Sequence, residues 1–268
     1  MTDNSLSDWW EELLQVHEFI HYHEHATALT CREVDFLVEA LALQGGETIL
    51  DLGCGGGRHS LELARRGITM VGLDVAASVL KHARATASSE ALAVEFVQAD
   101  MRMLSEDARF DAVLMMNSSF GLFDDAANAA MLATCARALV PAGRLVLQCI
   151  NPYQIESYLR DMRSAWYALG EGVVLREAAF DPRHAMLQLG FRYLNANQGL
   201  DVHHPGDHVR LYGFPELSNL LHSAGLRPLS LFADAALPPE PFAETSQWQV
   251  VVARKEREVV SVDAESPL

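Results

Sequence analysis

The chain has 268 residues, of which 50% are hydrophobic and 21% are charged, and its formal net charge is −16 at pH 7. This composition fits one large globular domain and excludes a disordered chain. The negative charge disfavours a nucleic-acid partner, because it repels phosphate backbones and the arginines form no basic patch.

The first 29 residues are predicted to form a helical lid segment. Residues 8–25 carry apolar side chains at helical spacing, which indicates an amphipathic helix. A second helix is predicted to begin at Thr30, because Glu33 follows three residues later as in a capping box. It is expected to end at Gly45 and Gly46.

Short apolar segments and helical segments alternate between residues 30 and 151. Strands are predicted at 48–51, 68–73, 94–98, 110–116 and 144–150, with helices at 58–66, 77–87 and 128–139. This alternation predicts a doubly wound α/β fold, in which helices cover both faces of a mostly parallel sheet.

The pattern changes after residue 151. One helix is predicted at 152–163, followed by a hairpin of strands at 173–180 and 186–194 whose turn contains Asp181 and Pro182. A helix at 215–224 and strands near 229–232 and 249–253 then resume the α/β pattern. We therefore expect a core at 30–151, a β-rich insertion at 152–212, completion of the core at 213–255 and a tail at 256–268.

The segment from Asp51 to Arg58 has the sequence DLGCGGGR and lies between a predicted strand and a predicted helix. Doubly wound folds bind ligands at this edge. A dinucleotide-binding loop would need glycine at the position of Arg58, which disfavours an NAD enzyme. A carboxylate at the strand end suits the positive ammonium and sulfonium of S-adenosylmethionine (SAM), which has no pyrophosphate.

Polar residues also follow the next three predicted strands. Asp74, 23 residues after Asp51, can accept both ribose hydroxyls. Asp100 can accept from the adenine amine while the Met101 N–H donates to the ring, and residues 117–118 follow the fourth strand beside the sulfonium. The expected cofactor-binding set is Asp51, Gly53, Cys54, Gly55, Asp74, Val75, Asp100, Met101, Asn117 and Ser118.

With these motifs the chain resembles the class I, Rossmann-like, SAM-dependent methyltransferases over about residues 30–254. The resemblance covers the loop at 51–57, Asp74, Asp100, Met101 and the turn at 141–144. It implies a seven-stranded, mostly parallel sheet with one antiparallel strand, the last, and SAM as cofactor.

The stretches 33–37, 57–59, 117–121 and 209–212 look like a bacterial subgroup of small-molecule methyltransferases. In that subgroup a β-rich insertion after strand five lies over the active site. Its members act on chemically different acceptors, so this likeness does not identify the substrate.

Methyl transfer needs alignment and exclusion of water more than a catalytic base. The candidate catalytic residues are Tyr22, His23 and His25 in the lid segment and Arg210 in the insertion, near His203, His204 and His208. Helix-end histidines exposed to solvent are the alternative interpretation. We predict no metal site, because the alternating histidines of residues 17–25 would not all converge on one ion.

The sequence therefore predicts a methyltransferase (EC 2.1.1 type) that methylates an O, N or C atom of a small molecule, alone or as a homodimer. A SAM-binding sensor or scaffold without turnover and an RNA or protein methyltransferase are the alternatives. No apolar run approaches the roughly 18 residues of a membrane span, and the N-terminus lacks a secretory pattern. We expect a cytoplasmic protein with no membrane partner.

Overall fold

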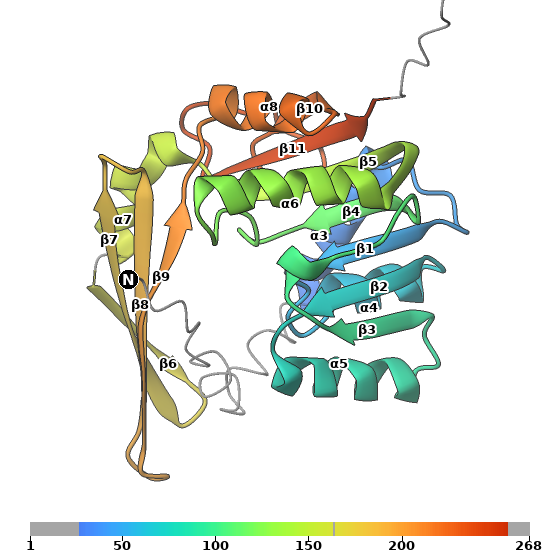
Figure 1. Cartoon of the computed structure of the whole chain (residues 1–268). Helices are drawn as coiled ribbons and strands as arrows, with labels where there is room; N and C mark the ends of the chain where they lie inside the picture. Colours follow the sequence, from blue (N-terminus) through green and yellow to red (C-terminus); the bar gives the residue numbers. More distant parts are fainter. Residues whose placement is uncertain (1–26, 163, 257–268) are drawn as a thin grey trace, which may run out of the picture.

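The computed structural model describes residues 27–162 and 164–256. They form a seven-stranded sheet and a separate four-stranded sheet that faces one of its edges (Figure 1). The strands of the larger sheet are β1 (Thr48–Leu52), β2 (Thr69–Asp74), β3 (Val94–Gln98), β4 (Phe110–Met115), β5 (Leu139–Ile150), β10 (Leu226–Phe232) and β11 (Trp248–Lys255).

The order of strands across the larger sheet is β10-β11-β5-β4-β1-β2-β3. The pairs among β1 to β5 are parallel, whereas β11 runs antiparallel to both β5 and β10. The prediction of a mostly parallel sheet whose last strand is reversed is therefore confirmed.

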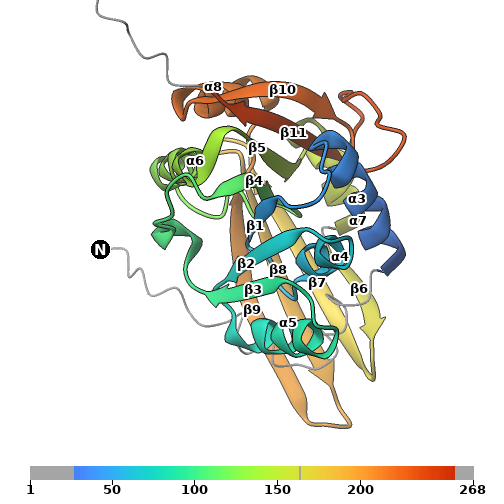
Figure 2. The same ribbon diagram turned by 90° about the vertical axis from the view of Figure 1, so that its right-hand side faces the viewer.

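Helices cover both faces of this sheet, as Figure 2 shows in the view turned by 90°. They are α3 (Thr27–Ala40), α4 (Arg58–Arg65), α5 (Ala77–Ser89), α6 (Asp125–Ala138) and α8 (Phe214–Ser223). The buried side chains of α6 and α8 pack with Leu50, and those of α3 and α4 pack with Ile49. Successive side chains of a strand point to opposite faces, so β1 contributes to both halves of the core.

The smaller sheet is antiparallel, with the order β6-β7-β8-β9. Its elements are the turn η2 (Pro152–Gln154), the helix α7 (Ile155–Met162) and the strands β6 (Ser164–Leu169), β7 (Gly172–Asp181), β8 (Met186–Asn195) and β9 (Leu200–Arg210). Its inner face, which includes Ala178, Leu187 and Val209, packs in one cluster with Ile150 at the end of β5. The second sheet is thereby anchored beside the carboxyl edge of the first.

The capping interpretation of Thr30 was wrong. Helix α3 already begins at Thr27, so Thr30 lies inside it, and its hydroxyl accepts a hydrogen bond from Arg58 Nη1 at 3.1 Å. Strands β6 and β9 were not predicted. Pro205 and Gly206 are uncommon inside strands, and β9 accommodates them because it is an edge strand of its sheet.

Several expectations fall on residues that the structure does not describe. The lid helix at 8–25, with Tyr22, His23 and His25, lies outside the described residues, as does almost all of the tail. Among residues 27–162 and 164–256, no helix has the length and apolar character that crossing a bilayer requires.

Candidate functional site

The glycine loop follows β1 at the edge of the sheet that faces the second sheet, where the arrowheads of β1 to β4 end in Figure 1. The N–H groups of Gly53 and Cys54 both donate to the carbonyl oxygen of Leu73, at 2.8 and 3.0 Å. These bonds turn the chain over the end of β2. Gly53, Gly55 and Gly57 have φ angles of 77°, 53° and 75°, a region that disfavours side chains.

The glycines of the loop serve different purposes. A Cβ atom on Gly57 would lie 2.6 Å from the ring of Phe96, so the absent side chain lets the loop pack on β3. A Cβ on Gly55 would meet no atom within 4 Å. The main chain at Gly55 is therefore open to a ligand, whereas Gly57 is required by packing.

Asp74 lies at the end of β2 and is held by the loop. Its Oδ2 accepts the N–H of Gly55 at 2.7 Å and its Oδ1 accepts the N–H of Ala76 at 3.0 Å. Burial raises the pKa of Asp74, although these main-chain hydrogen bonds oppose the effect. Each carboxyl oxygen keeps a lone pair for a further donor, so Asp74 can accept two ribose hydroxyls.

Asp51 and Cys54 are buried residues in the first half of the loop. Asp51 Oδ2 accepts the hydroxyl of Ser60 at 2.7 Å, which joins the end of β1 to α4. Burial, together with the charges of Asp51 and Asp74, raises the pKa of the Cys54 thiol well above its usual range. The thiol therefore stays neutral and contributes packing to the loop rather than a nucleophile.

The third strand end is more constrained than the sequence indicates. Arg102 donates through its N–H and its guanidinium to both oxygens of Asp100, and this hydrogen bonding lowers the pKa of Asp100. An adenine amine would have to share these oxygens with Arg102. Val75 is 41% exposed and Met101 is half-buried, so both offer apolar surface beside Asp74 and Asp100.

The fourth strand end places Asn117 and Ser118 beside the glycine loop. The neighbouring hydroxyl of Ser119 would lie 2.9 Å from a Cβ on Gly53, which shows how closely the two segments approach. The buried Oγ of Ser118 has no hydrogen-bond partner among the described residues. A buried polar atom without a partner is uncommon in a folded protein and fits a ligand group at this position.

Sequence reasoning missed a buried ionic cluster behind the loop. Glu33 on α3 accepts a hydrogen bond from Arg58 and lies 3.0 Å from Nε2 of His59, the first two residues of α4. Burial would raise the pKa of Glu33, but the hydrogen bonds with His59 and Arg58 outweigh it and lower the pKa. The cluster ties α3 to the helix that follows the glycine loop.

Arg210 lies where β9 rejoins the core. Its Nε is 3.2 Å from Asp125 Oδ1, it also pairs with Glu216, and its guanidinium lies 4.4 Å from the ring centroid of Tyr212. The side chain is 13% exposed, so these contacts fix the guanidinium at the joint between β9 and the core. Of the predicted insertion histidines, His203 and His208 are exposed. The described residues contain no cluster of three or more metal-ligating side chains.

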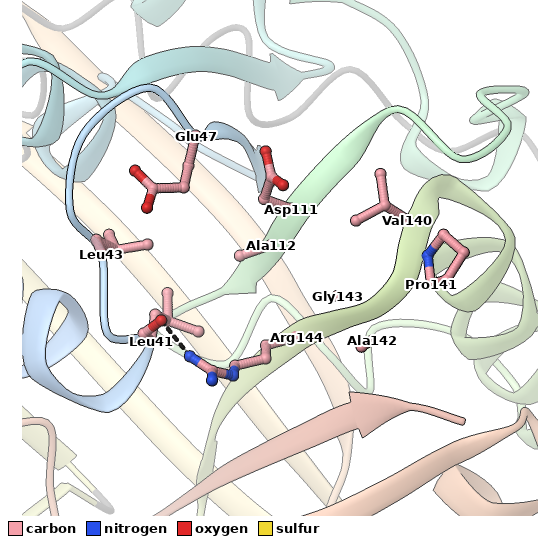
Figure 3. Close-up of a pocket in the computed structure, with 10 residues that line it drawn as sticks. All are labelled: Leu41, Leu43, Glu47, Asp111, Ala112, Val140, Pro141, Ala142, Gly143 and Arg144. Atoms are coloured by element: carbon pink, nitrogen blue, oxygen red, sulfur yellow. Dashed lines mark hydrogen bonds between the residues drawn. The ribbon is translucent and has the colours of Figure 1, made fainter. Parts of the chain in front are cut away.

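A hollow of about 200 Å³ lies at the other edge of the sheet, where β1 and β4 begin (Figure 3). It is bordered by Glu47, Asp111 and residues 141–144, which were predicted to form a turn before the fifth strand but lie inside β5. Both carboxylates accept main-chain N–H groups there, Asp111 from Thr48 and Glu47 from Gly45. None of the predicted cofactor-binding residues borders it.

The comparisons with known proteins agree with this arrangement. Residues 49–143, which include the first four strand ends, match the family model described as a methyltransferase domain. Residues 49–143 therefore carry a methyltransferase domain. SAM is its cofactor, and the open main chain at Gly55, the acceptor lone pairs of Asp74 and the unpartnered hydroxyl of Ser118 fit that group.

Similar proteins share this methyltransferase domain. The chain is 28% identical over 212 residues to a cypemycin N-terminal methyltransferase from Streptomyces sp., covering 79% of this chain and 84% of that protein. Other curated relatives align over 50% to 64% of their own length.

Solved structures show the same fold. A SAM-dependent methyltransferase from Clostridium acetobutylicum superposes with a TM-score of 0.76 at 15% identity, covering 89% of this chain and 98% of that one. A SAM-bound amino pentose methyltransferase from Micromonospora echinaspora superposes with a TM-score of 0.61 at 20% identity, covering 87% and 91%.

Proposed function

We propose that the protein is an enzyme that transfers the methyl group of SAM to an O, N or C atom of a small molecule. The observation that carries this proposal is the edge of the methyltransferase domain. Four consecutive strands end there with Asp51, Asp74, Asp100 and the 117–118 segment, and a second sheet faces them. Such an edge binds the donor while the second sheet borders the space for an acceptor.

The cofactor supplies an activated methyl group, so the chain's own residues are needed for binding, alignment and exclusion of water. In this proposal Asp74 accepts the ribose hydroxyls and the main chain at Gly55 lies against the amino-acid end. Val75 and Met101 flank the adenine. Asn117 and Ser118 border the sulfonium, between the amino-acid end and the acceptor.

The side chains of the second sheet and the net charge both favour a small-molecule acceptor over a nucleic acid. Arg176 on its inner face donates to the hydroxyl of Tyr158 at 2.7 Å, and its guanidinium lies 5.3 Å from the ring centroid of Phe191. Aromatic side chains bury large areas and exclude water from a reaction site. The net charge of −16 opposes binding of RNA.

The test is methyl transfer from tritium-labelled SAM in an extract depleted of endogenous methyltransferases. We expect the full-length protein to label the small-molecule fraction and an Asp74→Asn variant to label it far less. Label confined to RNA or to large proteins would contradict a small-molecule acceptor. SAM binding without transfer in extracts from several growth conditions would instead favour a sensor or scaffold.

A further inference from the structure

The segment that follows β4 has a strained main chain. Asn117 and Ser118 have φ angles of 57° and 62°, so two consecutive residues with side chains occupy the left-handed region. Asparagine is enriched in this region among residues other than glycine, but serine is not. Such strain persists only where the surrounding structure holds it, and it is concentrated at functional sites.

Gln148 on β5 holds both strained residues. Its side-chain Oε1 accepts the N–H of Asn117 at 3.1 Å, and its main-chain oxygen accepts the N–H of Ser118 at 2.9 Å. The residue is only 1% exposed, so water does not replace these bonds. One buried glutamine therefore satisfies the main-chain donors of the whole strained pair.

The side chain of Gln148 is itself fixed from the other side. Its Nε2 donates to Asp234 Oδ1 at 3.4 Å, and that oxygen also accepts the N–H of Ala235 at 2.8 Å. Asp234 Oδ2 pairs with Arg32 on α3 at 3.1 Å. The amide of Gln148 is thus oriented with its oxygen toward the 117–118 segment and its nitrogen toward Asp234.

The strained segment presents a hydroxyl that the described residues leave unsatisfied. Ser119 donates to the carbonyl oxygen of Met116 at 2.7 Å, whereas the buried Oγ of Ser118 finds no partner among the described residues. The segment lies against Gly53, the first glycine of the loop. Gly53 lies two residues before Gly55, whose main chain is assigned to the amino-acid end of the cofactor, so the segment that carries the Ser118 hydroxyl borders this part of the loop.

We propose that Gln148 is a positioning residue for SAM, which holds the 117–118 segment so that the Ser118 hydroxyl hydrogen-bonds the amino-acid end of the cofactor. Gln148 acts through this segment and does not contact the cofactor. The proposal rests on the proposed function only in placing the cofactor at this edge.

The test compares two buried glutamines on neighbouring strands. Gln148→Leu removes the side-chain oxygen that accepts the N–H of Asn117, and it keeps the main-chain oxygen that accepts the N–H of Ser118. Gln249→Leu is the matched control, because Gln249 on β11 is 0% exposed and its Nε2 donates to the main-chain oxygen of Tyr212 at 2.5 Å. Urea unfolding gives the stability of each variant, and calorimetry gives its dissociation constant for S-adenosylhomocysteine.

We expect both leucine variants to lose stability, but only Gln148→Leu to bind S-adenosylhomocysteine more weakly, by about tenfold, the equivalent of one lost hydrogen bond. Equal affinity in the two variants would overturn the proposal. A wild-type protein that does not bind S-adenosylhomocysteine would instead contradict the proposed function.

Two milder variants keep the test decisive if a leucine variant does not fold. Ser118→Ala removes a hydroxyl without a partner in the described chain, so we expect unchanged stability and weaker binding. Asn117→Gly relieves the left-handed strain, so we expect equal or greater stability. Glycine also lets the segment leave the conformation that places the Ser118 hydroxyl, so we expect weaker binding. A role limited to stability would leave the affinity of both variants at the wild-type value, which would overturn the proposal.

Discussion

The carboxyl edge of the seven-stranded sheet and the inner face of the four-stranded sheet are built in different ways. At the edge, main-chain groups dominate, as in the bonds from Gly53 to Leu73 and from Gly55 to Asp74. On the second sheet, side chains dominate, as in the contacts of Arg176 with Tyr158 and Phe191.

This difference explains why the cofactor can be inferred and the acceptor cannot. A site made of main-chain groups requires glycine where φ is positive or where space is lacking, and it leaves a pattern in the sequence. A surface made of side chains can change its chemistry through substitutions that leave the fold unchanged. Substitutions in the two regions should therefore separate binding of the cofactor from use of the acceptor.

The largest effect is expected within the glycine loop. Gly57→Ala places a Cβ 2.6 Å from the ring of Phe96 at a φ of 75°, so we expect a loss of about 3 kcal/mol in the free energy of unfolding. Gly55→Ala has open space and should lose about 1 kcal/mol, the cost of its φ angle.

Urea unfolding measures both losses, and calorimetry with S-adenosylhomocysteine should show that Gly55→Ala weakens binding although it folds. Equal destabilisation by the two alanines would show that packing on β3 does not distinguish these glycines.

Asp74 gives the next largest effect, on binding rather than on folding. In Asp74→Asn the carboxylate that accepts the ribose hydroxyls is lost, so we expect the dissociation constant for S-adenosylhomocysteine to rise about a hundredfold. Affinity that stays within threefold of the wild type in calorimetry would remove Asp74 from the site.

The pH dependence of binding follows from the raised pKa of Asp74. Because folding favours the protonated form, Asp74 contributes stability at acidic pH, and this contribution is lost as the pH rises through its raised pKa. Binding needs the charged form, so wild-type affinity should fall on acidification at a pH above the ordinary aspartate value of 3.8. Calorimetry from pH 7 downward should show this fall in the wild type and not in Asp74→Asn.

The joint between the two regions should affect stability alone. The hydroxyl of Tyr212 donates to Asp125 Oδ1 at 2.7 Å and accepts from Asn128 Nδ2 at 3.0 Å. Tyr212→Phe leaves the buried amide of Asn128 with one partner fewer, so we expect a loss of about 2 kcal/mol in urea unfolding. An accompanying tenfold loss of cofactor affinity would mean that the joint also shapes the edge.

The smallest effect on the cofactor is expected from the second sheet. Arg176→Met removes the hydrogen bond to Tyr158 and retains most of the apolar stem, so we expect about 1 kcal/mol of lost stability. Cofactor affinity should stay within twofold of the wild type, while labelling of the acceptor changes. Unchanged labelling kinetics would remove Arg176 from the acceptor side.

The sequence predicts the core well because its signals are local. The strand at 94–98 and the helix that begins at Arg58 follow from hydrophobic period and glycine placement, and the structure confirms both. The pairing of Arg102 with Asp100 and that of Glu33 with Arg58 and His59 could not be predicted, because each depends on side-chain geometry or on contacts between distant elements. Strand β9 was missed because local propensity argues against a strand that tertiary pairing stabilises.

The most direct test of the account is calorimetric titration of the full-length protein with S-adenosylhomocysteine and, separately, with NAD⁺. Our prediction is saturable binding of S-adenosylhomocysteine at one site per chain and no binding of NAD⁺, because Arg58 stands where a dinucleotide loop needs glycine. Folded protein that binds NAD⁺, or that binds neither compound, would contradict it.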